Sequence, residues 1–139
     1  NQFNFGMILI NINIMKKIFV IYILLFFTAA YATGHLNEKD RKATLKCAGL
    51  YYANSMIPQG TLELDKIVHS IASKKFLSTY LVKVGVKEDV VNSELNKSVD
   101  ELYGKPYDDK KTKDCDKFIN KLIPESKAEI DKLVRSGIY

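Results

Sequence analysis

The chain has 139 residues, a formal net charge of +5, 47% hydrophobic and 27% charged residues, and two cysteines. This length suits one small domain with a single core. The mildly basic balance has no long run of like charge, which excludes a typical nucleic-acid-binding groove.

The N-terminal residues differ in pattern from the rest of the chain. Residues 1–14 resemble translated upstream sequence. Residues 15–32 then combine a positive start, a short apolar run and a small-x-small ending, which together are typical of a secretory signal peptide. Cleavage after Ala32 would leave residues 33–139 as a single domain with a net charge of about +3, because two lysines leave with the leader.

A membrane anchor is the competing interpretation of this leader. Its apolar run from Ile18 to Ala32 has 15 residues, fewer than the ~20 that a spanning helix needs. No cysteine follows the run, which excludes a lipoprotein anchor. We therefore expect a periplasmic or secreted protein that meets the membrane only transiently, through its signal peptide.

Export determines how the two cysteines are expected to behave. In an oxidising compartment, Cys47 and Cys115 are predicted to pair with each other. They lie 68 positions apart, and the chain-entropy model gives such a loop about 4 kcal/mol of stabilisation. No Cys-x-x-Cys motif is present, and His35 and His69 stand alone. The sequence therefore predicts a structural disulfide, no metal site and no cofactor.

The first helix is predicted over residues 38–56. Asn37 is a suitable N-cap, and Asp40 three residues later can return the hydrogen bond. Pro58 and Gly60 follow and end the helix. One face is marked by residues at spacings of four and three: Ala43, Cys47, Leu50, Asn54 and Ile57.

The next stretch, residues 62–84, is apolar on two nearly opposite faces. As one straight helix, with Thr61 as its N-cap, it would be apolar all round and would have to be central. Alternatively, it breaks near residues 73–75 into two short helices. The polar residues that cluster where the phase changes favour the break.

Gly85 is predicted to end this stretch, and Glu88 and Asp89 stand where the first turn of another helix favours acidic residues. That helix is predicted to end at Gly104 and Pro106.

Asp108 or Asp109 is expected to cap the following helix, and Pro124 to end it or to begin the last one. The last helix is predicted to close at Gly137. The similar segments NSMIP (54–58) and NKLIP (120–124) are interpreted as two helix ends. Because no stretch alternates like a strand, the predicted fold is an all-α bundle of five or six helices with one disulfide.

His69 is the strongest candidate for chemistry, because Asp65 four residues earlier could orient its imidazole. We interpret it instead as a half-exposed histidine paired with its neighbour, since no nucleophile is placed beside it. No catalytic residue is predicted, and the protein is expected not to be an enzyme. A small hydrolase using His69 is a further alternative.

Two tyrosines are candidates for partner binding. Tyr103 and Tyr107 lie in a predicted loop, residues 103–109, where a large side chain with a polar tip suits a binding surface. The edge of a small core would suit them equally well. A second candidate contact surface is the loop 57–61, which contains Pro and Gly.

Three segments carry a resemblance to a known group: KCAGLYYA, ELYGK and KDCDKFINK. With these segments the chain resembles small two-cysteine helical proteins of the Gram-negative periplasm, nearest the immunity family that neutralises peptidoglycan amidases delivered by type VI secretion. The resemblance implies an all-helical, disulfide-bonded protein, often a homodimer, that binds its amidase and plugs the catalytic cleft. Only Cys47 and Cys115 can be matched to that family.

The expected function is therefore that of an exported, non-enzymatic helical protein that binds another exported protein, such as a toxin. The alternative is a periplasmic or secreted carrier of an apolar small molecule, in which the stretch 62–84 would line the cavity.

Overall fold

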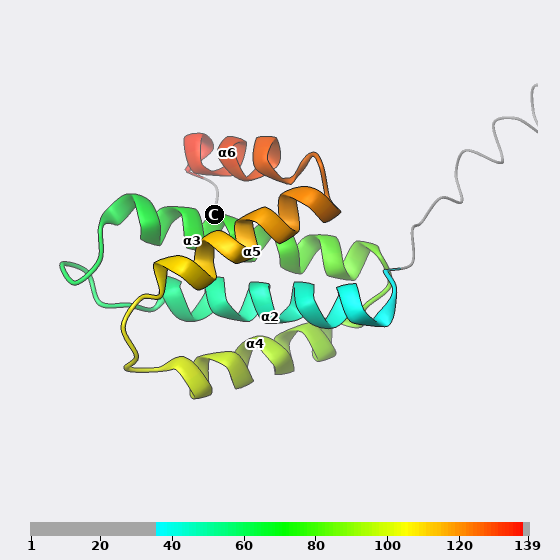
Figure 1. The fold of residues 1–139 in the computed structure, drawn as a ribbon, viewed down its shortest axis with the longest axis horizontal. Coiled ribbons are helices and arrows are strands. Elements are labelled where there is room, and N and C mark those ends of the chain that lie inside the picture. The colour runs from blue at the N-terminus through cyan, green and yellow to red at the C-terminus, as the bar shows by residue number, and fades with distance from the viewer. Residues whose placement is uncertain (1–35, 138–139) are drawn as a thin grey trace, which may run out of the picture. The chain divides into compact units, whose positions relative to one another are not determined.

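A computed structural model describes residues 36–137, and in this range the chain forms five helices and no strand. The helices are α2 (Glu38–Ser55), α3 (Leu64–Lys83), α4 (Glu88–Leu102), α5 (Asp109–Leu122) and α6 (Ser126–Ser136) (Figure 1). The predicted all-α bundle is confirmed. The predicted signal peptide, 15–32, and the segment before it lie outside the described residues.

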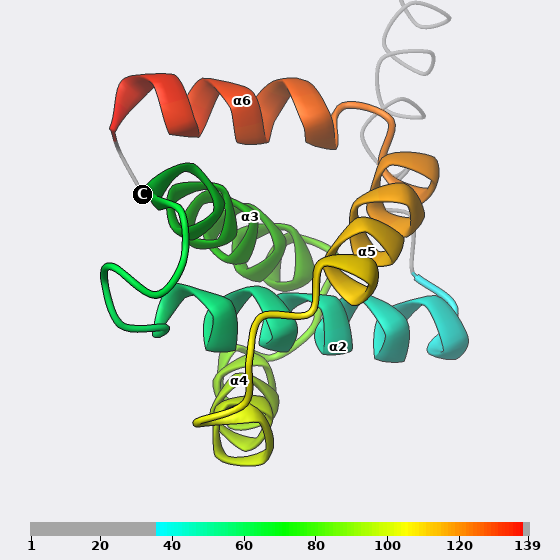
Figure 2. The ribbon, with the colours of Figure 1, turned by 60° about the vertical axis from the view of Figure 1, so that its left-hand side comes forward.

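Helix α2 is the central element of the bundle. It packs against α3, α4 and α5, and in two views it lies between α4 and α5 (Figures 1 and 2). Five consecutive residues, 47–51, are all buried. Because successive residues of a helix point in different directions, this run means that every side of α2 is covered there. Its sequence therefore shows little contrast between faces.

Helix α3 is one continuous helix, so the predicted break near residues 73–75 is wrong. Ser73 is fully buried, and the ammonium of Lys74 lies 4.9 Å from the centroid of the Tyr52 ring. Leu77 and Leu81 join the core formed with α2, and α3 also packs against α6. The change of apolar face thus marks a change of neighbouring helix.

Two of the predicted caps are confirmed. The Asn37 side chain accepts a hydrogen bond of 2.8 Å from the backbone N–H of Asp40, and it donates one of 2.7 Å to that carboxylate. Asp108 caps α5 by accepting from the backbone N–H of Lys111 at 2.9 Å.

Other helix ends differ in part from the prediction. Thr61 is not a cap, because α3 begins three residues later and the Thr61 hydroxyl donates to the Pro58 carbonyl at 2.6 Å. Pro124 lies after the end of α5 and before the start of α6. Gly137 closes α6 in the left-handed conformation, at φ 63°. Both segments that end in Ile-Pro follow helix ends, as predicted.

The predicted disulfide joins Cys47 of α2 to Cys115 of α5, with 5.5 Å between the two Cα atoms. Helix α5 otherwise contacts the bundle over short stretches of α2 and α6. The covalent bond therefore adds to the packing of α5 on the core, which centres on Ile119.

Helices α2 and α4 lie in close contact at Gly49. A Cβ atom added there would overlap both the Cβ and the Oγ of Ser98. Ser98 is itself held by a 3.0 Å hydrogen bond from its hydroxyl to the Glu94 carbonyl. Gly49 is therefore required for the distance between these helices.

We expect Gly49→Ala to lower the free energy of unfolding by about 1–3 kcal/mol, as overpacking in a core does, despite the better helix propensity of alanine. Urea unfolding followed by circular dichroism measures the change. The double variant Gly49→Ala/Ser98→Gly removes the overlap and should be more stable than the sum of the two single effects predicts. Simple additivity of the two changes would contradict this account of the contact.

Candidate functional site

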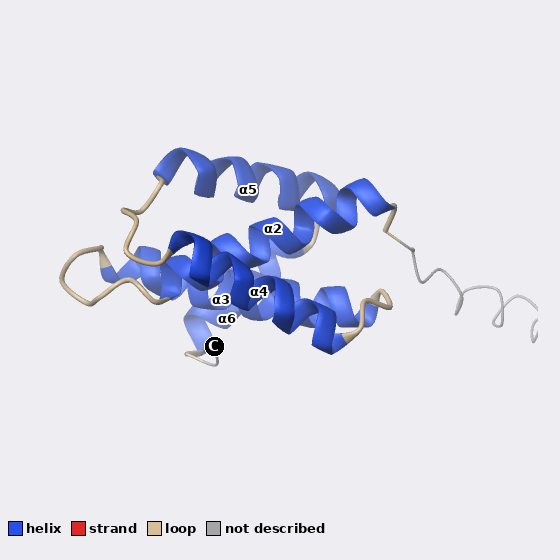
Figure 3. Cartoon of the chain, turned by 90° about the horizontal axis from the view of Figure 1, so that it is seen from below, coloured by secondary structure: helices blue, strands red, loops and turns tan. Residues whose placement is uncertain are grey.

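A groove of about 710 Å³ lies at the end of the bundle where α2 ends and α5 begins. Its floor comes from Leu50 and Ala53 of α2 and from Ile57 just beyond that helix, and one wall comes from α4, through Val99 and Leu102. The two loops that border it lie at the same end of the molecule (Figure 3). These loops contain the segments 57–61 and 103–109, which the sequence singled out as contact surfaces.

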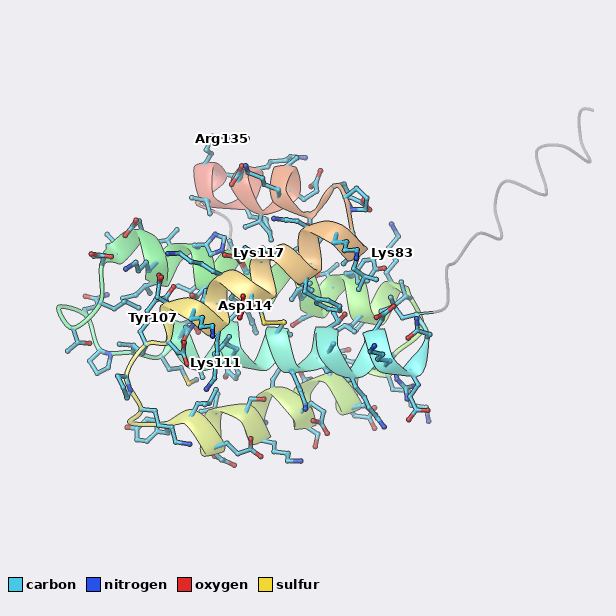
Figure 4. The ribbon with its side chains drawn as sticks, viewed as in Figure 1. Lys83, Tyr107, Lys111, Asp114, Lys117 and Arg135 are labelled. Atoms are coloured by element: carbon cyan, nitrogen blue, oxygen red, sulfur yellow. A yellow bond between two sulfur atoms is a disulfide. The ribbon has the colours of Figure 1, made fainter. Side chains whose placement is uncertain are left out.

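Both candidate tyrosines line this groove. Tyr103 is 79% exposed, whereas Tyr107 is partly buried and has the ammonium of Lys66 at 5.4 Å from its ring centroid. Figure 4 shows Tyr107 and Lys111 close together at the start of α5. Met56, at 45% exposed, adds a second accessible apolar side chain to the groove.

The groove exists because α4 and α5 diverge. Each of them packs against α2, but they make no contact with each other. The segment that joins them contains Gly104, at φ 74°, and Pro106, so it cannot continue as helix. A strip of α2 is therefore left between two helices.

Three charged residues line the groove: Lys105, Asp108 and Lys111. The hydrogen bond from the Lys111 backbone N–H, together with the Lys111 ammonium at 3.3 Å, lowers the pKa of Asp108 below its usual value. Lys105 has no ion-pair partner within residues 36–137. The groove thus combines an apolar floor with a mildly positive rim.

A second, smaller site surrounds His69, where a cavity of about 180 Å³ opens between α3, α5 and α6. The Tyr51 hydroxyl donates to Oδ1 of Asp116 at 2.6 Å, and Nε2 of His69 lies 3.1 Å from the same oxygen. The predicted pairing of His69 with Asp65 is wrong. Asp116 follows Cys115 directly, so the disulfide places it beside α2.

The arrangement around His69 differs from a catalytic triad. The hydroxyl of Ser73 lies 3.3 Å from Nε2 of His69, the same nitrogen that contacts Asp116. In a triad the carboxylate and the nucleophile contact different ring nitrogens, so that a proton can pass through the imidazole. Ser73 is also fully buried. This geometry suits a structural link between helices.

The three partners of this link shift one another's pKa values. The hydrogen bond to Asp116 raises the pKa of His69, with burial acting against it. Burial acts to raise the pKa of Asp116, but the hydrogen bonds from His69 and Tyr51 outweigh it and lower that pKa. Burial, followed by the contact with Asp116, raises the pKa of Tyr51. The ionised pair is therefore favoured in the folded protein.

Within residues 36–137, no group of three or more His, Cys, Asp or Glu side chains is arranged to hold a metal ion. None of the helices described has the length and apolar character to cross a lipid bilayer. No protein-family model matches the chain, and comparison with curated proteins and with solved structures gives no significant match. The resemblance to the amidase immunity family therefore rests on the three short segments alone.

We expect the pKa of His69 to lie above 6.5 and to fall in Asp116→Asn, because the hydrogen-bonded carboxylate is lost. Titration of the His69 ring signals by NMR measures it. Asp65→Asn is the matched control and should leave the value unchanged. A fall in the control, with none in Asp116→Asn, would contradict the observed pairing.

The same pair gives stability a defined pH dependence. A raised histidine pKa stabilises the fold fully below pH ~6.5, and the contribution is lost as the pH rises through the folded value. The lowered pKa of Asp116 acts in the acid range, because its contribution to stability is lost as the pH falls through the folded value. We therefore expect the difference in unfolding free energy between wild type and His69→Gln to shrink from pH 6 to pH 8, measured by urea unfolding.

Proposed function

We propose that this is an exported, non-enzymatic protein that binds another exported protein in its groove. The observation that carries the proposal is the convergence of the two loops, with Tyr103, Tyr107 and Met56, on one apolar groove. Tyrosine and methionine are enriched in protein interfaces. Two segments separated by more than 40 positions thus contribute to one surface.

The proposed location in the periplasm or outside the cell is supported by two independent features. One is the disulfide between Cys47 and Cys115, which indicates an oxidising compartment. The other is the pattern of residues 15–32, with its positive start, apolar run and small-x-small ending. The partner would then be a protein of the same compartment.

Within this class we propose an immunity role against a peptidoglycan amidase toxin. The support is the resemblance of three segments, two of which contain the cysteines. The segment ELYGK, residues 101–105, includes Tyr103 and Lys105, which line the groove. The likeness thus includes part of the proposed binding surface.

One observation favours a second candidate, the carrier of an apolar small molecule. The groove volume of about 710 Å³ falls within the range of roughly 300–1,000 Å³ for small-molecule sites. No residue of α3 lines this groove, so a bound molecule would lie on α2 and α4 instead of the stretch 62–84. Mass spectrometry of an organic extract of the purified protein tests this candidate, and an empty extract would count against it.

The proposal predicts that Met56→Asp/Tyr103→Asp loses its partner. Both side chains are exposed, so the fold should persist while the apolar contact is lost. Affinity capture from periplasmic extract, compared with wild type, should show at least a tenfold drop in the partner, measured by quantitative mass spectrometry.

A matched control is Val82→Asp/Val90→Asp, which changes two similarly exposed apolar residues outside the groove, one near the end of α3 and one near the start of α4. This control should capture the partner as wild type does. Equal capture by the groove variant and wild type would overturn the proposed binding site.

The immunity role has its own test. Cells that lack the protein should lyse beside kin that deliver the amidase. Wild type and the Val82→Asp/Val90→Asp control should rescue them, whereas the groove variant should not. Survival of cells without the protein would contradict the immunity role.

A further inference from the structure

We infer that the groove receives one face of an amphipathic α-helix of the partner, with acidic residues beside its apolar stripe. This inference rests on the proposed function, because it specifies what occupies the same groove. It follows from the shape of the floor, from the absence of a sheet edge and from the charges on the rim.

The floor has the geometry of a helix-packing surface. Leu50 and Ala53 lie three residues apart on α2, which places them on one face of that helix. Ile57, two residues beyond the end of α2, adds a third apolar side chain to the floor. Val99 and Leu102, three apart, continue the apolar surface onto α4. A docked helix, whose apolar residues would also recur at spacings of three and four, matches this surface.

No helix of residues 36–137 fills the groove between α4 and α5. Helices α4 and α5 lie on either side of α2 without contacting each other (Figures 1 and 2). At the other end of α2, by contrast, the core is shared with α3 and α4. A helix from the partner would cover Ala53 and Ile57, which are partly exposed at the end of α2.

Other modes of peptide binding fit less well. Addition of a strand requires a sheet edge, and residues 36–137 contain no strand. Proline-rich segments dock on aromatic platforms, but the floor here is aliphatic. Tyr103 and Tyr107 stand in the bordering loop, where they would contact the sides of the docked helix.

The charged residues on the rim determine which sign of charge on the partner helix fits the groove. Asp108 is the acidic residue that lines the groove, and it is already used as the cap of α5 and as a partner of Lys111. Lys66, beside Tyr107, is neutralised by Glu63 at 2.6 Å. Among residues 36–137 Lys105 has no counter-charge, so acidic residues on the partner helix complement the rim.

The test uses three synthetic peptides and fluorescence anisotropy. Two are helices of about 18 residues with the same leucine stripe, one flanked by Glu and one by Lys. The third is a proline-rich peptide. We expect the acidic helix to bind wild type at least tenfold more tightly than the basic helix, with a preference that weakens as salt is added.

Charge reversal is the decisive variant. Lys105→Glu/Lys111→Glu should reverse the preference between the two helices without changing the circular dichroism spectrum. Lys105→Glu alone, which breaks no ion pair within residues 36–137, should at least abolish the preference for the acidic helix. Equal or tighter binding of the basic or the proline-rich peptide, or no binding of the acidic one, would overturn the inference.

Failure of this inference can be told apart from failure of the proposed function. If Met56→Asp/Tyr103→Asp loses the captured partner but Lys105→Glu retains it, the acidic-helix inference fails and the groove stands as the binding site. If both variants retain the partner, the groove itself is ruled out.

Discussion

The attachment of α5 to α2 is the constraint on which the rest of the structure depends. It has three points, spaced three and four residues apart along α2: the disulfide from Cys47, the hydrogen bond from Tyr51 to Asp116 and the 3.1 Å hydrogen bond from Asn54 to Thr112. A hydrogen bond contributes about 1 kcal/mol net, whereas closing a loop of 68 positions by a disulfide is worth about 4 kcal/mol. Of these three links the covalent bond contributes most; it adds to the core packing of Ile119 in holding the helix that carries Lys111 of the groove.

The polar cluster around Asp116 extends the same attachment to a third helix. One carboxylate oxygen of Asp116 accepts a hydrogen bond from the Tyr51 hydroxyl of α2 and lies 3.1 Å from Nε2 of His69 in α3. The backbones of α3 and α5 do not contact each other. A hydrogen-bonded histidine and aspartate in a cavity resembles a reactive site at first inspection. Ser73 and Asp116 contact the same ring nitrogen of His69, and Ser73 is buried. Both observations are typical of a structural link between helices.

The local features of the fold could be predicted from sequence because they depend on neighbouring residues. The caps at Asn37 and Asp108 use donors three residues away, and the disulfide required only two cysteines and an oxidising compartment. Two predictions failed where distant residues decide the outcome, and one failed because of a local contact. The break in α3 and the partner of His69 depend on which helices surround α3, and Thr61 bonds backward to Pro58.

The groove could be predicted only in part. Composition marked the two loops, with Tyr103 and Tyr107, as contact surfaces, but it did not show that they meet. That meeting depends on the divergence of α4 and α5 from α2, which is a property of the packed bundle. The groove floor was hidden for a related reason, since periodicity placed Leu50 and Ile57 on one face of the first helix but could not show which part of that face other helices leave uncovered.

The buried run in α2 has a consequence for the order of assembly. A chain emerges N-terminus first, so this helix is synthesised before every segment that shields it. The helices that cover most of it, α3 and α4, follow it along the chain, and its covalent partner lies 68 positions downstream. Intermediates with exposed apolar surface aggregate readily, so the interval before α3 and α4 have emerged is the stage at which α2 is most vulnerable.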